Sequence, residues 1–213
     1  MDRYQELHAK LAAAGQQQLL RFWSQLDADQ QARLAGQLDE IDFAELEKLI
    51  REYVLQRPKT QIPEDLGPAP YFPLVPRDEE QKALYAKAQA RGEELLRAGR
   101  VCCLTVAGGQ GTRLGFDGPK GTYPIAPVTG KSLFQYFAES ILRTGEKFGC
   151  RLTWYIMTSL LNREATEAFF KEHAFFGLAP EQVFFFTQGT MPAIGYDGKL
   201  LLAEKDSLSL SPN

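Results

Sequence analysis

Glycines and cations follow a run of apolar residues near the middle of the chain. Residues 101–107, Val-Cys-Cys-Leu-Thr-Val-Ala, run into residues 108–115, Gly-Gly-Gln-Gly-Thr-Arg-Leu-Gly, and then into Pro119 and Lys120. Glycine permits positive φ and lets backbone N–H groups come close to a ligand. Free N–H groups at the carboxyl end of a buried strand bind phosphate. The pattern predicts a phosphate-binding loop with Arg113 and Lys120 as cations for a triphosphate; a tight turn with two solvated cations is the alternative.

Two common phosphate-binding motifs do not fit this loop. The dinucleotide motif has the spacing G-x-G-x-x-G, but residues 109–115 hold one residue too many before the last glycine. The acidic residue that such sites place about 20 positions further on is also missing, because that region is predicted to be helical. A Walker motif needs a glycine five residues before Gly130, and that position is Ile125. Gly130 and Lys131 are therefore interpreted as a turn leading into a helix.

A longer string carries a specific resemblance. Residues 107–115, Ala-Gly-Gly-Gln-Gly-Thr-Arg-Leu-Gly, are followed after three residues by Pro-Lys-Gly at 119–121. This string resembles the signature of the UDP-sugar pyrophosphorylases. Within that group it is most similar to the eukaryotic-type UDP-N-acetylhexosamine (UDP-N-acetylglucosamine) pyrophosphorylases. Plant-type UDP-glucose pyrophosphorylases carry a related loop with a different interior, so Gln110 and Arg113 favour the N-acetylhexosamine branch.

Strands and helices are predicted to alternate around the loop. Apolar strands are expected at 101–107, 152–159 and 183–187, with helices over 132–148 and 162–173. This order predicts an α/β fold with a mostly parallel sheet covered by helices on both faces. Ligands of such sheets bind beyond the carboxyl ends of the strands, where the glycine loop and Gln188 would meet. The resemblance implies a Rossmann-like, glycosyltransferase-A-like nucleotidyltransferase, with an incomplete sheet in this chain.

Three regions are expected along the chain. Residues 1–57 are predicted to form a helical N-terminal arm, with apolar residues at helical spacing over 19–26 and a capping residue, Asp42, before another helix. Residues 58–77 hold six prolines and read as a stiff connector. Residues 78–213 are expected to be the N-terminal part of the nucleotidyltransferase catalytic domain.

Gln188 is a second candidate for nucleotide recognition. Its amide can donate and accept, which suits a pyrimidine edge, although it could instead bond to its own turn. The segment 187–193, Thr-Gln-Gly-Thr-Met-Pro-Ala, resembles the family segment in which this glutamine reads uracil. The resemblance also implies that Arg113 stabilises the departing pyrophosphate and that Lys120 neutralises charge at the α-phosphate, which makes them the catalytic candidates. The implied nucleotide-binding residues are Ala107, Gly108, Gly109, Gly111, Thr112, Arg113, Lys120 and Gln188.

The resemblance implies a reaction: UTP and a hexose-1-phosphate, with N-acetylglucosamine-1-phosphate favoured, give UDP-sugar and pyrophosphate. It also implies Mg²⁺, whose ligands, like the sugar contacts, are expected beyond residue 213, so no metal ligand is assigned here. We therefore expect a fragment that is inactive alone and lacks the C-terminal half of the same enzyme. Three alternatives stay open: a UDP-glucose or broad-specificity UDP-sugar pyrophosphorylase, a non-catalytic UTP-binding module, and a structural protein built on the helical arm.

Composition narrows the class of protein. The 213 residues carry a net charge of −3, which gives no sign of a nucleic-acid or membrane surface. No apolar run is long enough to span a bilayer, and the polar N-terminus is not a signal peptide. Cys102 and Cys103 are adjacent in a predicted strand and cannot easily pair, so a cytoplasmic protein is expected. Asp197 is interpreted as a turn residue and His173 as a cation near a helix end, rather than as a metal ligand and a catalyst.

Overall fold

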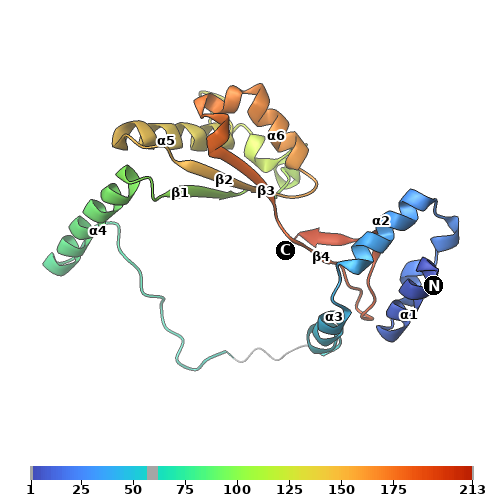
Figure 1. Ribbon diagram of the computed structural model, residues 1–213. Coiled ribbons are helices and arrows are strands. Elements are labelled where there is room, and N and C mark those ends of the chain that lie inside the picture. The colour runs from blue at the N-terminus through green and yellow to red at the C-terminus, as the bar shows by residue number, and fades with distance from the viewer. Residues whose placement is uncertain (1, 57–61, 213) are drawn as a thin grey trace. The chain divides into compact units, whose positions relative to one another are not determined.

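The computed structural model describes residues 2–56 and 62–212 (Figure 1). The chain divides into two compact units. The arm unit consists of the described residues of Met1–Gly67 and Gly189–Asn213, and the sheet unit is Pro68–Gln188. No helix in the described part of the chain is long and apolar enough to cross a membrane.

The sheet unit contains a three-stranded parallel sheet in the order β1-β2-β3, which confirms the predicted parallel α/β arrangement. Leu104 of β1 lies opposite Tyr155 of β2, which lies opposite Phe184 of β3. The strands are β1 (Cys102–Val106), β2 (Thr153–Thr158) and β3 (Val183–Thr187), and the longer helices are α4 (Glu79–Arg97), α5 (Leu133–Phe148) and α6 (Arg163–Glu172). Short 3₁₀ turns lie at Thr112–Leu114, Lys120–Thr122, Ala174–Gly177 and Pro180–Gln182.

Helices α5 and α6 cover one face of this sheet (Figure 1). An aromatic cluster joins the layers: the ring of Phe170 on α6 lies 5.0 Å from Phe134 of α5 and 5.4 Å from Trp154 of β2. All three side chains are almost fully buried. The Trp154 indole N–H donates to Thr105 Oγ1 at 2.9 Å, so burial of this ring leaves no polar atom without a partner. This packing holds the carboxyl ends of β1 and β2 in fixed positions.

The expectation that helices cover both faces was wrong for this chain. Five apolar side chains on the opposite face are between 40% and 70% exposed, and no element of the sheet unit covers them: Leu104, Val106, Tyr155, Phe184 and Phe186. The strand order gives the reason. Crossover connections between parallel strands are right-handed, and both connections here step in the same direction along the sheet. Both connecting helices therefore fall on the same face.

The arm unit is helical in its N-terminal part, but residues 19–26 do not form the α-helix that their spacing predicts. They form two 3₁₀ turns whose buried Leu19, Leu20 and Leu26 join the core of the unit, so tertiary packing overrides the helical spacing. Asp42 caps the helix after it by accepting from Ala44 N at 3.0 Å. The elements are α1 (Arg3–Ala13), 3₁₀ turns Gln17–Leu20 and Trp23–Gln25, α2 (Ala28–Asp39), α3 (Phe43–Leu49) and a π-helical turn Ile50–Leu55.

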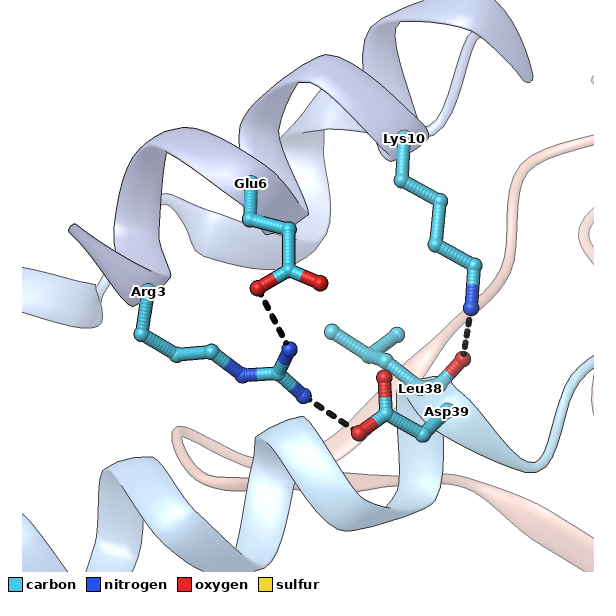
Figure 2. A network of polar contacts seen from close by, with 5 residues as sticks. All are labelled: Arg3, Glu6, Lys10, Leu38 and Asp39. Carbon is cyan, nitrogen blue, oxygen red and sulfur yellow. Dashed lines mark hydrogen bonds and ion pairs between the residues drawn. The ribbon is translucent and has the colours of Figure 1, made fainter. Parts of the chain in front are cut away.

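Polar contacts join α1 to α2 (Figure 2). The Arg3 guanidinium bonds to Glu6 at 2.8 Å within α1 and also forms an ion pair with Asp39 of α2. Lys10 Nζ donates to the Leu38 carbonyl oxygen at 3.0 Å. These groups are exposed or partly exposed, so each contributes little stability by itself. The buried leucines between the two helices supply the larger share.

The end of the chain packs with the arm, whereas the sequence had suggested that all of 78–213 belongs to one region. Its strands pair antiparallel as β4 (Thr190–Pro192) with β7 (Leu210–Pro212) and β5 (Leu202–Glu204) with β6 (Ser207–Leu208). Leu200 and Leu208 lie in the leucine core of α1 and α2. The Gln16 amide donates to Gly198 O and accepts from Leu200 N, both at 2.9 Å. Apolar burial and these long-range bonds hold the segment in the arm unit.

The turn at Asp197 and Gly198 has the predicted role. It lies between Ile194 and Leu200, which form an antiparallel bridge. Asp197 Oδ1 accepts from Lys199 N at 3.1 Å, so this carboxylate stabilises its own turn. The expected proline-rich connector at 58–77 falls partly on residues 57–61, which lie outside the described residues.

Candidate nucleotide-binding site

Parallel pairing brings the candidate segments to one rim of the sheet. The N–H of Ala107, just past β1, donates to Met157 O of β2 at 2.7 Å. The N–H of Gln188, just past β3, donates to Thr158 O at 2.8 Å. The two segments that the sequence singled out therefore leave the sheet on either side of the end of β2. The rim predicted from strand order is present.

Three consecutive N–H groups face no partner in this loop. Among the described residues, the N–H groups of Gly108, Gly109 and Gln110 donate to no other group, whereas Gly111 N bonds to Gly118 O at 2.8 Å. A row of unpaired N–H groups after a buried strand is a site of partial positive charge. Such groups can donate hydrogen bonds to the oxygens of a phosphate without the loop first breaking bonds of its own.

Gly108 allows the loop to lie against Gln188. A Cβ at this position would be 2.6 Å from Gln188 Oε1, a distance that real Cβ atoms do not adopt. Positive φ has a smaller part in the loop than expected, because between residues 107 and 115 only Gly115 has it, with φ of 66°. The Gln188 side chain forms no hydrogen bond to any described residue, so it does not bond to its own turn. Its amide is free for a ligand next to the unpaired N–H groups.

We expect Gly108→Ala to weaken UTP binding about 10-fold while the free energy of unfolding changes by less than about 1 kcal/mol. The new methyl group would push away only the end of the flexible Gln188 side chain, so the fold tolerates it and the site does not. Isothermal titration with UTP and thermal denaturation measure the two quantities. Gly189→Ala is the matched control, because no atom lies within 4 Å of its Cβ position. Equal UTP affinity in both variants would contradict a role for the close approach of Gly108 and Gln188 in UTP binding.

Lys120 lies beside the glycine loop. Its N–H donates to Gly109 O at 3.0 Å, and its Nζ is 3.7 Å from the position of a Cβ on Gly109. It also lines a cavity of about 110 Å³ with Val106, Gly109 and two phenylalanines of α5, Phe134 and Phe137. Small-molecule sites usually enclose about 300 Å³ or more, so this cavity alone cannot hold a nucleoside triphosphate. A triphosphate would lie across the open rim instead.

Arg113 and Thr112 lie in a separate turn that follows the unpaired N–H groups along the chain. Both lie in the 3₁₀ turn Thr112–Leu114 and are exposed. The Arg113 guanidinium makes no hydrogen bond or ion pair with any described side chain, so it is available to an anion. The structure thus brings together Ala107, Gly108, Gly109, Lys120 and Gln188, and it leaves Arg113 and Thr112 on a neighbouring turn.

Unlike Lys120, Lys131 forms an ion pair within the described part of the chain. Its Nζ bonds to Glu139 of α5 at 2.6 Å, and this contact lowers the pKa of the Glu139 carboxyl group below its usual value. Gly130, with φ of 66°, forms the turn before the helix. The interpretation of Gly130 and Lys131 as a turn, rather than as a second phosphate loop, agrees with this geometry.

Asn162 is a residue that the sequence reasoning missed. It precedes α6, where asparagine normally caps a helix, yet its side chain makes no capping bond. Instead it is fully buried and bonds to the glycine loop through Ala107 O at 3.0 Å and Gly109 O at 3.4 Å. The sequence did hold one signal for Asn162: it is a polar residue that comes shortly after β2, whose carboxyl end lies at the predicted ligand rim.

The residues present do not fit a protein-held Mg²⁺. Within the described ranges, no three His, Cys, Asp or Glu side chains lie close enough together to hold a metal ion. The rim offers N–H groups and ammonium or guanidinium groups, which repel a cation, while Mg²⁺ prefers oxygen ligands. Burial raises the pKa of the Cys103 thiol in β1, and the adjacent Cys102 adds to the shift, which favours the neutral thiol over the thiolate.

Comparison with known proteins decides the family. The sequence family described as UTP--glucose-1-phosphate uridylyltransferase matches residues 46–212. The chain belongs to this family. It is 35% identical over 224 residues to human UDP-N-acetylhexosamine pyrophosphorylase-like protein 1, covering 100% of this chain and 44% of that protein. It is 36% identical over 214 residues to the UDP-N-acetylglucosamine pyrophosphorylase of Saccharomyces cerevisiae, covering 94% and 44%. The resemblance read from the glycine loop is confirmed.

Solved structures agree with the fold. The uridine diphosphate N-acetylglucosamine pyrophosphorylase from Trypanosoma brucei, in complex with inhibitor, matches with a TM-score of 0.73 and 28% identity, covering 100% of this chain and 43% of that one. The putative UDP-N-acetylglucosamine pyrophosphorylase from Entamoeba histolytica matches with a TM-score of 0.55 and 37% identity over 60% of this chain and 34% of that one. The chain therefore spans less than half of the length of these relatives.

Proposed function

We propose that this chain forms the UTP-binding part of a uridylyltransferase that makes UDP-sugar and pyrophosphate from UTP and a hexose-1-phosphate. N-acetylglucosamine-1-phosphate is the favoured sugar phosphate, because relatives at 35% and 36% identity are named for N-acetylhexosamine and N-acetylglucosamine. The observation that carries the proposal is the row of unpaired N–H groups at Gly108–Gln110, with Lys120 beside Gly109 and Gln188 against Gly108. This arrangement suits a phosphate chain attached to a pyrimidine.

Each group has a defined task in this proposal. The N–H groups of the loop bind the β- and γ-phosphates, and the Gln188 amide reads the uracil edge. The sugar-phosphate oxygen attacks the α-phosphorus in line, a new P–O bond forms, and the bond to pyrophosphate breaks. Lys120 neutralises charge at the α-phosphate, and Arg113, on its exposed turn, stabilises the departing pyrophosphate. The chain contributes positioning and positive charge rather than covalent chemistry.

The remaining part of the enzyme would supply what this chain lacks. The matched region is 44% of the length of the curated relatives, and the sheet unit leaves an apolar face open at Leu104, Val106, Tyr155, Phe184 and Phe186. Apolar faces of parallel sheets are normally covered. We propose that a C-terminal half packs on this face and brings the Mg²⁺ ligands and the sugar contacts. The chain alone is then a nucleotide-binding fragment without turnover, and a cytoplasmic location is part of the same proposal.

Binding and turnover test separate parts of the proposal. The chain should bind UTP more tightly than ATP in isothermal titration, and equal binding of the two would remove the uracil-reading role. Pyrophosphate release from UTP and N-acetylglucosamine-1-phosphate, assayed in a magnesium buffer, should stay at background with the chain alone. Release above background would overturn the fragment assignment. Release after addition of the unmatched part of the yeast relative would support the missing half directly.

UDP-glucose synthesis is the second candidate, because the matching family is described by glucose-1-phosphate. A panel of glucose-1-phosphate, N-acetylglucosamine-1-phosphate and N-acetylgalactosamine-1-phosphate on the completed enzyme distinguishes the two. Preference for glucose-1-phosphate would favour this candidate. UTP binding without turnover in the completed enzyme would instead indicate a non-catalytic module.

A further inference from the structure

Asn162 connects the end of β2 to the glycine loop. Its side chain is fully buried, with an exposed fraction of 0%. Its Oδ1 accepts from Ser159 N at 2.9 Å, while its Nδ2 donates to Ala107 O at 3.0 Å and to Gly109 O at 3.4 Å. The partners fix the orientation of the amide, because a backbone N–H can only donate and a carbonyl oxygen can only accept.

The two loop bonds have a consequence for the neighbouring N–H groups. In a trans peptide the C=O of one residue and the N–H of the next point in opposite directions, and the described chain has no cis peptide bond. The carbonyl oxygens of Ala107 and Gly109 both accept from Asn162 Nδ2, and that of Gly109 also accepts from Lys120 N at 3.0 Å. The N–H groups of Gly108 and Gln110 therefore point away from Asn162 and out of the buried side of the loop.

We propose that Asn162 is a positioning residue that orients the N–H groups of Gly108 and Gln110 toward the phosphates of the bound nucleotide. This inference rests on the proposed UTP site and adds a residue to it. Asparagine suits the task because one short side chain must accept from Ser159 and donate to two loop carbonyls. An aspartate would keep the first bond and lose the others, and an alanine would lose all three.

The test compares two nucleotides that share the base and sugar and differ in phosphate number. Titration of the full chain with UTP and with UMP gives an affinity ratio that reports on the phosphate cradle. In Asn162→Ala and Asn162→Asp this ratio should fall about 10-fold, while the UMP affinity changes less than about 2-fold. The alanine variant separates loss of positioning from the added negative charge of the aspartate.

Thr166→Val is the matched control. Thr166 is fully buried one turn further along α6, and its Oγ1 has no hydrogen-bond partner among the described residues. The valine is nearly isosteric and removes no hydrogen bond to the loop, so the UTP-to-UMP ratio of this variant should equal that of the wild-type chain. A ratio unchanged in the Asn162 variants, with wild-type UTP binding intact, would overturn the positioning role.

A measurement on the wild-type chain covers the case in which the Asn162 variants do not fold. In ¹H–¹⁵N spectra, inorganic triphosphate should shift the amide resonances of Gly108 and Gln110 strongly, with saturation. Absence of such shifts in a chain that binds UTP would overturn the inference while leaving the proposed function in place. A wild-type chain that binds no UTP would instead overturn the proposed function.

Discussion

UTP should bind the Lys120→Ala chain about 10- to 100-fold more weakly than the wild-type chain. The ammonium group lies beside Gly109 and the unpaired N–H groups of the loop, where a phosphate oxygen would meet both. A hydrogen bond to a charged group contributes roughly 1.5–3 kcal/mol, which corresponds to that range of affinity. Isothermal titration with UTP at constant ionic strength is the measurement, because weak ionic contacts depend on salt.

Lys131→Ala provides the control for Lys120→Ala. It removes the same charge a short distance along the chain, but its Nζ is bound to Glu139 and not to the loop. UTP affinity should change less than about 2-fold in this variant.

In a completed enzyme, Lys120→Ala and Arg113→Ala should each lower kcat by about 10²-fold or more. Near-normal turnover in either variant would remove that residue from the mechanism.

Leu200→Ala should lower the free energy of unfolding of the arm unit by about 2–5 kcal/mol. Leu200 is 2% exposed and lies in the core with the leucines of α1 and α2. Removing its branched end leaves a cavity among side chains that come from opposite ends of the sequence. The same variant should leave the sheet unit unchanged, because Leu200 belongs to the other compact unit.

Hydrogen–deuterium exchange resolves the two units in one experiment. In Leu200→Ala, amides of α1 and α2 should exchange faster, while those of β2 and α5 should keep their protection. Leu201→Ala is the control, since the neighbouring side chain is 45% exposed and should cost well under 1 kcal/mol. If α1 and α2 kept wild-type protection in Leu200→Ala, the packing of the chain's end with the arm would be contradicted.

Local sequence signals were enough to predict the strands, the helices and the parallel arrangement of the sheet unit. Strands of β-branched and aromatic residues, helices with one apolar face and glycines at turns all reflect interactions within a few residues. The parallel order followed from the alternation of these elements, and the carboxyl-end rim followed from the parallel order. Gly108 could be proposed as a site residue for the same reason, because a glycine at the end of a strand allows close approach of another group, here the Gln188 side chain.

The arm unit shows where local signals failed. Residues 19–26 have helical spacing but form 3₁₀ turns, since Leu19, Leu20 and Leu26 pack into a core that also contains Leu200. Residues 189–213 looked like a continuation of the sheet region, yet Gln16 binds their backbone from the other end of the sequence. Such partners cannot be read from spacing, because the contacts join residues about 180 positions apart.

The sequence by itself determined the parallel arrangement of the strands and the family, and it proposed the residues of the phosphate loop, because glycine, lysine and apolar patterns act through local geometry. Only the tertiary structure decided that one face of the sheet stays open, since this depends on the direction in which both crossovers step. It also showed the partners of Asn162. This residue occupies a helix-cap position in the sequence, but its side chain bonds to carbonyl oxygens more than 50 residues earlier. Local sequence patterns do not specify which distant segments pack together, so only the long-range contacts of the folded chain identify these partners.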